Sequence, residues 1–459
     1  MITRISQWSY ATLFVIIASV AGFLFMVVTP PFQSPDEPNH YFRSFQIASG
    51  RLIGVMHDWH YGGFLPKQLQ TFPDLMMRTE SGMIPFHKDI KFPIEKIFQG
   101  FALRKDLENM SFIGFPNTAS YPFMMYLPHA LGIFLGKIMV NSELAIFYSG
   151  RLFGLLCYVL CGFHILRSVA KPYLEIFFLS LLLPMSLYLG AMITADTATI
   201  LAAFAASAYS LTQRHRSIPI TQKNIWPHFF FAVILGLVKP VYAVVVGLVF
   251  LVPFSPASSW LKNSLMRCGL VAITFLEVLG VVFLGKGAEF SLRDDILVNP
   301  GLQLDVVLHH PIKFLGVAGT YFFERFPVAV QQLVGVFGWL DTIMPWLGYG
   351  LGVSLIVLTV IKKDPEERRF SWKELGLILL VIVGAILGTL FFLFLVWSPA
   401  GEWTIDGFQG RYLLPVLPLG LIVARHLIGR KFSISKWLLM GGFIILLGIA
   451  ITAIVSRFY

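Results

Sequence analysis

The chain has 459 residues, of which 56% are hydrophobic and only 13% are charged. A soluble domain carries roughly 25% charged residues, so most of this chain faces lipid or other apolar helices, and an ordinary soluble domain is excluded. The formal net charge of +10 does not indicate a nucleic-acid partner, because the basic residues lie in short runs between apolar stretches, as positive-inside loops do.

The first apolar run, residues 10–28, is long enough to cross a membrane, since a span needs about 20 mostly apolar residues. It ends in VTPPF rather than at a small-residue cleavage site, so we interpret it as an uncleaved anchor and not as a signal peptide. Residues 1–29 are therefore assigned to an N-terminal anchor span. The mixed segment that follows, residues 30–148, is predicted to be a large outer loop with juxtamembrane helices.

The segment directly after this span, PPFQSPDEPNHYFRSFQIASG (residues 30–50), is the most informative stretch of the chain. Ser34 to Glu37 reads as the capping box S-x-x-E, which predicts a helix from about Asp36 to Ser49. Asp36 and Glu37 then lie at the start of the helix, at the membrane edge, and we expect them to point into the cavity of the bundle. The alternative is that both acids only complement the helix dipole.

The two sides of this predicted helix differ in chemistry. One side carries Asp36, His40 and Arg43. The other side is an apolar stripe, which we expect to lie on the membrane surface and which consists of Tyr41, Phe42, Phe45 and Ala48.

Residues 121–138 form an apolar segment that we predict not to span the membrane. Pro122 and Pro128 suit a juxtamembrane or re-entrant helix better than an uninterrupted span. Counting this segment as a span would also move the basic stretches RHRSIPITQK and KKDPEERRFSWK to the outside, which the positive-inside rule disfavours.

The later apolar runs define the rest of the bundle. They cover residues 149–166, 172–190, 195–212, 226–238, 240–254, 267–285, 343–361, 374–397, 412–427 and 436–456. With the N-terminus inside, 17 of the 35 Lys and Arg residues lie in the predicted cytoplasmic segments, which are 1–8, 167–171, 213–224, 255–267, 362–373 and 425–436. The sequence therefore predicts an all-α polytopic membrane protein with a bundle of about 11 transmembrane helices. After residue 148, transmembrane helices cover 149–285, a second outer loop covers 286–342, and C-terminal transmembrane helices cover 343–459.

Asp196 and Lys239 lie at the outer ends of spans in the middle of the chain. Asp196, in PMSLYLGAMITADTATI, stands at the mouth of a tight outer turn, where it could also be a helix N-cap. Lys239, in LGLVKPVYAV, lies between two apolar half-runs, a costly position unless the charge is paired or hydrated. Its outer position suits a phosphate partner, and the alternative is that it snorkels to the interface. Glu277 lies within a span, and its role is left open.

A last polar group occurs in WTIDGFQGRYLLPVLPLG, residues 403–420. Arg411 stands at the outer start of a span, with Asp406, Gln409 and Tyr412 nearby. Basic residues of this chain are concentrated in the predicted cytoplasmic segments, so an arginine on the outer side is an exception to that distribution. This favours a role for Arg411 in binding an anion.

These residues together give outer acids, an outer lysine and an outer arginine around one mouth of the bundle. Attack by a hydroxyl group on a phosphate-activated sugar needs that set, because a carboxylate accepts the proton of the acceptor and cations hold the departing phosphate. No nucleophile elbow, P-loop, H-E-x-x-H or Rossmann glycine pattern is present in the sequence.

The motifs resemble a bacterial family of predicted membrane proteins of unknown function, the domain-of-unknown-function family 2142. The resemblance runs from about residue 30 to residue 420. It rests on PDEPNHYFRSFQIASG, NTASYPFMMYLPHALG, RL at 151–152, P-x11-D ending at Asp196, KPVY, NPGLQLDVVLHHP, GVFGWLDTIMP and GFQGRYLLPVLPLG, in that order. That family in turn resembles the GT-C glycosyltransferases, which take sugar from a polyprenyl-phosphate carrier on the outer face of the membrane.

The resemblance implies roles for individual residues. Asp36 and Glu37 match the acidic pair of the first outer loop, whose aspartate is usually the base or a metal ligand, and both are expected to be catalytic. Asp196 corresponds to a second acid, Lys239 to a lysine at the next outer turn, and Arg411 matches by position only. The residues expected to bind substrate are His40, Tyr41, Arg43, Asp196, Lys239, Tyr242, Asp341, Gln409, Arg411 and Tyr412. The cofactor is left open: none, or a divalent metal at Asp36 and Asp196.

We therefore predict an inverting glycosyltransferase in the bacterial cytoplasmic (inner) membrane, with its site facing the outside or periplasm. Its partners would be a lipid-linked sugar donor, a glycan or lipid acceptor of the cell envelope, and membrane lipids. The alternative is a transporter or flippase of a lipid-linked glycan, which should have paired broken helices and charges near the bilayer midplane. A non-catalytic scaffold is a third possibility, for which Asp36 would be dispensable.

Overall fold

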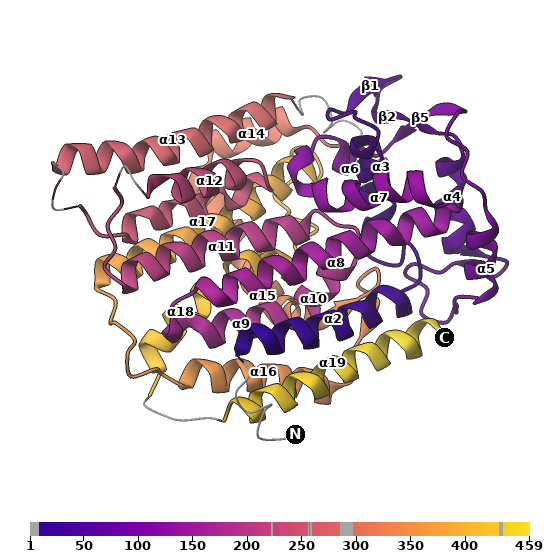
Figure 1. The fold of residues 1–459 in the computed structure, drawn as a ribbon. Coiled ribbons are helices and arrows are strands. Elements are labelled where there is room, and N and C mark those ends of the chain that lie inside the picture. Colours follow the sequence, from indigo (N-terminus) through magenta and orange to yellow (C-terminus); the bar gives the residue numbers. More distant parts are fainter. Residues whose placement is uncertain (1–8, 222–223, 256, 258, 285–296, 431–434) are drawn as a thin grey trace.

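The computed structural model describes residues 9–221, 224–255, 257, 259–284, 297–430 and 435–459. The predicted cytoplasmic segment 1–8 and the predicted start of the second outer loop at residue 286 lie outside these residues. The described chain is mostly helical, and its long helices run roughly side by side across Figure 1. Residues of the first outer loop gather at one end of this bundle together with the C-terminus (Figure 1).

Six helices or helix pairs among the described residues are long and apolar enough to cross a membrane. They are α2 (Tyr10–Val28), α8 (Glu143–Ser168), α13 (Trp260–Leu284), α17 (Trp372–Val396), η5 with α18 (Gly410–Val416 and Leu417–Ile428) and α19 (Lys436–Phe458). The chain is therefore membrane-embedded and all-α in its bundle. Other predicted spans appear as α11 (Asp196–His215) and as shorter apolar helices: α12 (Ile225–Gly236), η3 (Pro240–Leu251) and α16 (Trp346–Ile361). The count of about 11 spans stays a prediction.

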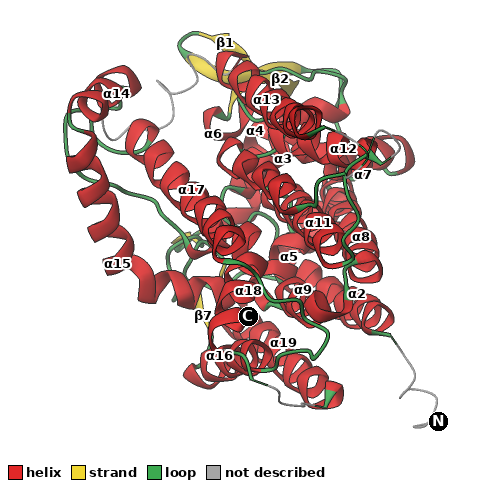
Figure 2. Cartoon of the chain, turned by 90° about the vertical axis from the view of Figure 1, so that its left-hand side faces the viewer, coloured by secondary structure: helices red, strands yellow, loops and turns green. Residues whose placement is uncertain are grey.

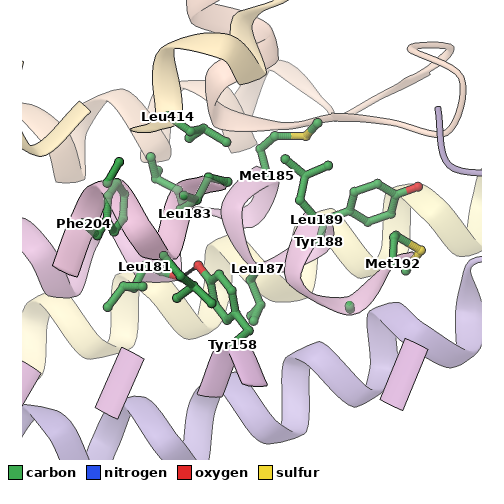
Figure 3. Close-up of a cluster of buried hydrophobic side chains, with 14 of the residues drawn as sticks. Tyr158, Leu181, Leu183, Met185, Leu187, Tyr188, Leu189, Met192, Phe204 and Leu414 are labelled. Atoms are coloured by element: carbon green, nitrogen blue, oxygen red, sulfur yellow. Dashed lines mark hydrogen bonds between the residues drawn. The ribbon is translucent and has the colours of Figure 1, made fainter. Parts of the chain in front are cut away.

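A further candidate span is bent in the middle. The pair η2–α9 (Lys171–Tyr173 and Leu174–Leu182) and α10 (Pro184–Ala191) meets at an angle of 59°. Pro184 cannot donate a backbone hydrogen bond, which explains a break at this point. The hydroxyl of Tyr158 donates to the carbonyl of Leu181 at 2.8 Å, beside the break (Figure 3). Buried apolar side chains surround the break, and it sets where α10 ends and the turn to Asp196 begins.

The first outer loop contains more than the juxtamembrane helices that were predicted. Its helices are α3 (Glu37–Ala48), α4 (Gln68–Met77), α5 (Glu95–Ala102), α6 (Pro116–Ala119), η1 (Phe123–Tyr126) and α7 (Leu127–Met139). A small antiparallel sheet, in the order β1 (Val55–His57), β2 (His60–Pro66), β5 (Met110–Gly114), and a hairpin of β3 (Arg78–Thr79) and β4 (Gly82–Met83) complete it. Asp58 and Trp59 both have positive φ, as the two-residue turn between β1 and β2 requires.

Helix α7 has 13 residues and therefore rises about 20 Å, which is less than the roughly 30 Å of a hydrocarbon core. Together with η1 it forms an apolar helix over Phe123–Met139, of the same length class as α12, η3 and α16, so the prediction that residues 121–138 do not span the membrane stays a prediction. The helix lies along α8, and two glycines one turn apart, Gly132 and Gly136, face the neighbouring helix near Ser149.

The described part of the predicted second outer loop is largely helical as well. It holds α14 (Pro300–His309), the 25-residue α15 (Pro311–Gly335) and a hairpin of β6 (Val336–Phe337) and β7 (Thr342–Ile343). Helices α14 and α15 lie beside α17 on one flank of the molecule (Figure 2).

Four of the segments predicted to be cytoplasmic, 167–171, 213–224, 362–373 and 425–436, meet at one end of the bundle. Helix α11 begins at Asp196 and reaches Arg214 about 27 Å further along its axis, so these two residues lie at opposite ends of the bundle. The contacts at the Arg214 end are the ion pairs Arg214–Glu374, Lys171–Glu366 and Arg425–Glu367 and the hydrogen bond from Arg214 to the carbonyl of Arg368. The grouping of these segments agrees with one common side of the membrane.

Two expectations for helix α3 were wrong. The predicted capping box is absent, because Asp36 has no capping side-chain bond, the hydroxyl of Ser34 has no partner, and Glu37 turns to Arg151 instead. A bond to a buried guanidinium is charge-assisted and stronger than one to a backbone N–H. The stripe expected on the membrane surface is also buried inside the protein, where Tyr41, for example, has no exposed area.

Candidate functional site

Glu37 and Arg151 form a buried pair that fixes the start of helix α3. Arg151 donates from Nε to Oε1 of Glu37 at 2.8 Å and from Nη2 to Oε2 at 2.6 Å, and both side chains have no exposed surface. The backbone N–H of Ile193 adds a bond to Oε1 of Glu37 at 3.1 Å. Arg151 also donates to the carbonyls of Met26, Thr29 and Pro30. Glu37 therefore joins three parts of the chain and offers no free carboxylate oxygen to a substrate.

Asp36 is placed differently from its neighbour. It lies in the left-handed region with φ 59° and ψ 10°, a conformation that Asp adopts more readily than most residues. Its Oδ1 accepts from Nδ2 of Asn117 at 3.3 Å, and its Oδ2 lies 3.5 Å from Nη2 of Arg411. The Asp36 side chain is 36% exposed, against 8% for Asp196 and 0% for Glu37. Asp36 is thus the accessible carboxylate of the three.

The turn before Asp36 also has an unusual backbone. Phe32 is a bulky residue with a φ of 64°, which is an outlier for its type. Its ring is buried among Tyr41, Phe72 and Phe147, and its carbonyl accepts from the indole N–H of Trp339 at 3.0 Å. Backbone held in such regions concentrates at functional sites, where the surrounding structure enforces it.

Arg411 joins the two carboxylates of the site. Its Nη1 lies 3.4 Å from Oδ2 of Asp196, while its Nη2 contacts Asp36. Lys239 donates to the other oxygen of Asp196, Oδ1. Arg411 and Lys239 are 4% and 15% exposed, so both cations are largely withdrawn from solvent. Asp36, Asp196, Lys239 and Arg411, hereafter the polar cluster, come from four separate parts of the chain.

Aromatic side chains form the wall of the polar cluster. The ring of Tyr412 lies 5.2 Å from the amino group of Lys239 and 5.6 Å from the guanidinium of Arg411, within the range of cation–π contacts. The hydroxyl of Tyr242 donates to the carbonyl of Tyr412 at 2.7 Å. His40 is linked to the hydroxyl of Tyr126 through Nδ1 at 2.8 Å.

Burial lowers the pKa of His40 well below its ordinary value. Asp196 opposes this lowering, whereas Lys239 and Arg411 add to it. A lowered pKa favours the neutral imidazole, in which one ring nitrogen donates a hydrogen bond and the other accepts one.

Several buried polar atoms around the polar cluster have no partner among the described residues. They are Nε of Arg411, Oε1 of Gln409, both side-chain polar atoms of Gln33 and the hydroxyl of Ser34. Buried polar groups in proteins are nearly always satisfied, so groups of this kind call for a partner such as water, an ion or a ligand. Within the described chain, unpaired donors and acceptors therefore occur on Arg411 itself, on Gln409 two residues before it, and in the segment that precedes Asp36.

Three residues predicted to bind substrate lie in other networks. The hydroxyl of Tyr41 donates to Glu143 at 2.7 Å in the interior. Arg43 is buried and donates to the side chain of Gln46 and to the carbonyls of Leu52 and Tyr121. Asp341 pairs with Arg457 at 2.9 Å. None of the three makes a described contact with the polar cluster.

Two residues next to the site were given no role in the sequence analysis, although both belong to the motifs that carry the family resemblance. Asn117 holds Asp36 and in turn accepts a bond from Asn39 at 2.7 Å, and it is the first residue of the motif NTASYP. Arg151 interrupts an apolar run, which is a signal for a buried partner. Neither partner can be read from the sequence, because the paired residues are 81 and 114 positions apart.

The polar cluster fits an anion better than a divalent metal. Both oxygens of Asp196 already face cations, so a metal bridging Asp36 and Asp196 would have to displace Lys239 or Arg411. Within the described residues, no three His, Cys, Asp or Glu side chains come together as a metal site. A divalent ion at Asp36 and Asp196 stays an untested prediction.

The fold and the polar cluster define a helical, membrane-embedded protein with a site of paired charges at one end of its bundle. The chain belongs to the family described as Predicted membrane protein (DUF2142), whose match covers residues 20–420. This confirms the family resemblance inferred from the motifs; the description names no activity. No match to this chain was found among the curated proteins or among the solved structures. The resemblance to GT-C glycosyltransferases stays a prediction.

Proposed function

We propose that the protein is an inverting glycosyltransferase that moves a sugar from a polyprenyl-phosphate carrier to a glycan or lipid of the cell envelope. The protein would act in a bacterial cytoplasmic membrane, with the polar cluster on the outer side. The observation that carries the proposal is the arrangement of Asp36, the exposed carboxylate, beside Arg411 and its partners Asp196 and Lys239. A base and an anion site thus lie side by side.

The proposed reaction has one step. The hydroxyl oxygen of the acceptor attacks the anomeric carbon of the donor from the face opposite the phosphate, and the bond from that carbon to the phosphate oxygen breaks. The proton of the hydroxyl passes to Asp36, and the negative charge that leaves stays on the carrier phosphate. A positioned carboxylate contributes roughly 10²–10⁴ in rate to such a transfer.

Arg411 and Lys239 suit the leaving phosphate. A guanidinium binds phosphate through two parallel N–H groups, and Nε of Arg411 has no partner among the described residues. Arg411 is buried and Lys239 is 15% exposed, so their attraction for a developing negative charge is stronger than it would be in water. Asp196 would hold these two cations in place until the phosphate arrives.

A transporter or flippase of a lipid-linked glycan is the second candidate, and the bent pair α9–α10 is the observation in its favour. Broken helices in transporters usually bring polar groups or backbone ends to a substrate. The bend at Pro184 instead lies among apolar side chains and the satisfied hydroxyl of Tyr158. The transferase therefore has the better support.

Asp36→Asn tests the proposal. Asparagine keeps the shape of the side chain and its tolerance of positive φ, and it removes the charge. The purified protein in liposomes receives a labelled polyprenyl-phosphate hexose and a crude envelope lipid extract, and labelled product is measured. We expect the parent to form product and Asp36→Asn to lose at least about 100-fold in rate.

Asp58→Asn is the matched control, because Asp58 also has a positive φ in the same outer loop and is exposed. It should retain the activity of the parent. Equal activity of Asp36→Asn and the parent would remove Asp36 as the base. If the parent forms no product but moves the labelled lipid across the bilayer, the transporter becomes the better proposal.

A further inference from the structure

A groove lies on the flank of the bundle, away from the polar cluster. It has a volume of about 810 Å³ and lies between the start of α16, the end of α19 and strand β7. Its lining is mainly apolar along α19 and the 343–345 segment, where Ile449, Ala453 and Pro345 contribute. Lys88, Asp341 and Arg457 form its polar part.

The polar part of the groove has cationic hydrogen-bond donors that could bind an anion. Arg457 is 7% exposed and is held by Asp341 at 2.9 Å and by the carbonyls of Ile84, His87 and Ile90, yet its Nε has no partner among the described residues. Lys88 is exposed and makes no hydrogen bond or ion pair within the described chain. Because Asp341 offsets only one of the two cations, the lining carries one net positive charge.

Exposed aromatic side chains mark the depth of the groove relative to the membrane. Trp346 is 82% exposed, Phe86 is 66% exposed and Tyr459 is 44% exposed, and all three lie at this end of α16 and α19. Trp and Tyr gather at the level of the lipid headgroups, so the groove opens where the phosphate of a lipid would lie. Below it, Ile444 and Ile445 of α19 are exposed, as lipid-facing residues are.

The β6–β7 hairpin separates the groove from the polar cluster. The indole of Trp339 bonds the carbonyl of Phe32, and the N–H of Gly338 bonds the hydroxyl of Tyr188 at 3.3 Å. No residue of the groove lining contacts Asp36, Asp196, Lys239 or Arg411 within the described chain. A lipid in the groove would therefore not present its phosphate to Asp36.

We infer that this groove binds an anionic phospholipid of the surrounding leaflet, with its phosphate at Lys88 and Nε of Arg457 and an acyl chain along α19. The glycerophosphate headgroup supplies the anion that the polar part lacks, and the chain covers the apolar lining. The inference is independent of the proposed function, because it uses none of the residues of the polar cluster.

A glycine pair on α19 gives the sharpest test. A side chain at Gly448, which lines the groove, would meet no protein atom within 4 Å of its Cβ, and the same holds for Gly441 on the same helix outside the groove. Gly448→Leu therefore places a side chain in the groove from a Cβ that has free space around it, and Gly441→Leu controls for the change in helix propensity. Native mass spectrometry of protein taken from mixed phosphatidylglycerol and phosphatidylcholine nanodiscs counts the retained lipids.

A second pair tests the charge. Lys88→Glu reverses the cation at the groove, and Lys67→Glu makes the same change at an exposed lysine of the same loop that does not line it. We expect Lys88→Glu to lose about fivefold or more of the retained phosphatidylglycerol, since each basic residue near a membrane surface contributes about that factor. Gly448→Leu should also lower the retained phosphatidylglycerol, because its side chain takes the place of the acyl chain. Both control variants should match the parent.

Equal retention in Gly448→Leu and Gly441→Leu would overturn the inference. So would parent protein that retains phosphatidylcholine as well as phosphatidylglycerol. Undecaprenyl phosphate is added in a further arm: if it displaces phosphatidylglycerol from the parent at equal concentration, the groove belongs to a carrier lipid and the phospholipid assignment is wrong.

Discussion

Arg411 is in contact with both acids of the polar cluster, the accessible Asp36 and the buried Asp196. Its two terminal nitrogens lie 3.5 Å from Asp36 and 3.4 Å from Asp196, which are loose contacts for charge-assisted bonds. An anion that binds between the guanidinium and Lys239 can therefore draw Arg411 away from Asp36. That movement would free the carboxylate of Asp36 at the moment when a base is needed.

Glu37→Gln should destabilise the protein, because it leaves the charge of Arg151 buried without a counter-ion. Loss of one partner of a buried ion pair costs about 3–5 kcal/mol. Thermal unfolding in detergent, followed by size-exclusion chromatography, should show a lower melting temperature for Glu37→Gln and none of this loss for Asp36→Asn. A Glu37→Gln protein that is stable but inactive would return Glu37 to the list of catalytic groups.

The burial of His40 predicts a pH dependence of stability. The pKa of His40 is lower in the folded protein than in the unfolded chain. Below about pH 6.5 the imidazole is therefore protonated in the unfolded chain but not in the folded protein. Stability should therefore be complete above pH 6.5 and fall as the pH drops, by at most about 1.4 kcal/mol per unit for this residue. His40→Gln should flatten the fall in melting temperature between pH 7 and 5. An unchanged slope would mean that other groups cause it.

The sequence located the members of the polar cluster because each is a charge at the edge of an apolar run. A charge there must pair or stay hydrated, so Asp196, Lys239 and Arg411 were identifiable one by one. Their mutual pairing was not identifiable, because it depends on packing between distant helices. The same limit explains why Asp341 was assigned to the site, whereas its partner is Arg457.

At the scale of elements, the contact between α7 and α8 decides where His40 and Tyr126 lie. A Cβ at Gly132 would be 2.2 Å from the carbonyl oxygen of Ser149, so only glycine permits this approach. Small residues four apart, here Gly132 and Gly136, are typical of closely packed membrane helices. The spacing was present in the sequence, although it was not used to predict this contact.

Gly132→Ala should therefore lower stability by about 1–3 kcal/mol through overpacking against α8. Gly316→Ala on α15 is the control, since a Cβ there meets nothing within 4 Å and alanine is the better helix former. Chemical or thermal unfolding of the two variants should move in opposite directions. Equal shifts would mean that the approach of α7 to α8 is not limited by Gly132.

The small sheet of the first outer loop shows what element-level patterns miss. The turn between β1 and β2 has positive φ at Asp58 and Trp59, whereas the sequence signal for such a turn is Asn-Gly or Asp-Gly. Strand β2 is also buried in an irregular pattern rather than at alternate residues. Of the helices in the same loop, α3 and α7 were predicted because their apolar spacing and prolines are local signals, whereas α4, α5 and α6 were not predicted.

At the scale of the whole molecule, the orientation in the membrane is the prediction on which the proposed function depends. The basic segments around Arg214 and Arg368 meet at the end of the bundle opposite Asp196, as one common side requires. The side itself follows from the excess of Lys and Arg in those segments.

Cysteine labelling tests this orientation in a variant without Cys157, Cys161 and Cys268. Single cysteines at the exposed positions Lys88 and Asp406 should react with a membrane-impermeant maleimide in intact cells. A cysteine at Arg368 should react only after permeabilisation. Labelling of the cysteine at position 368 from outside would show that the topology is the reverse of the predicted one. The proposed reaction on the outer face would then be excluded.

The end of α19 is held by the first outer loop, and this has a consequence for the order of synthesis. Lys91 bonds the carbonyls of Ser456 and Arg457, and the N–H of Phe92 bonds the carbonyl of Phe458. These partners are about 365 residues apart, so at 5–20 residues per second the loop waits roughly 20–70 s for them on the ribosome. Until α19 has been made, the carbonyls of Ile84, His87 and Ile90 have no donor from Arg457, so this loop completes its hydrogen bonds only after the last helix of the chain is synthesised.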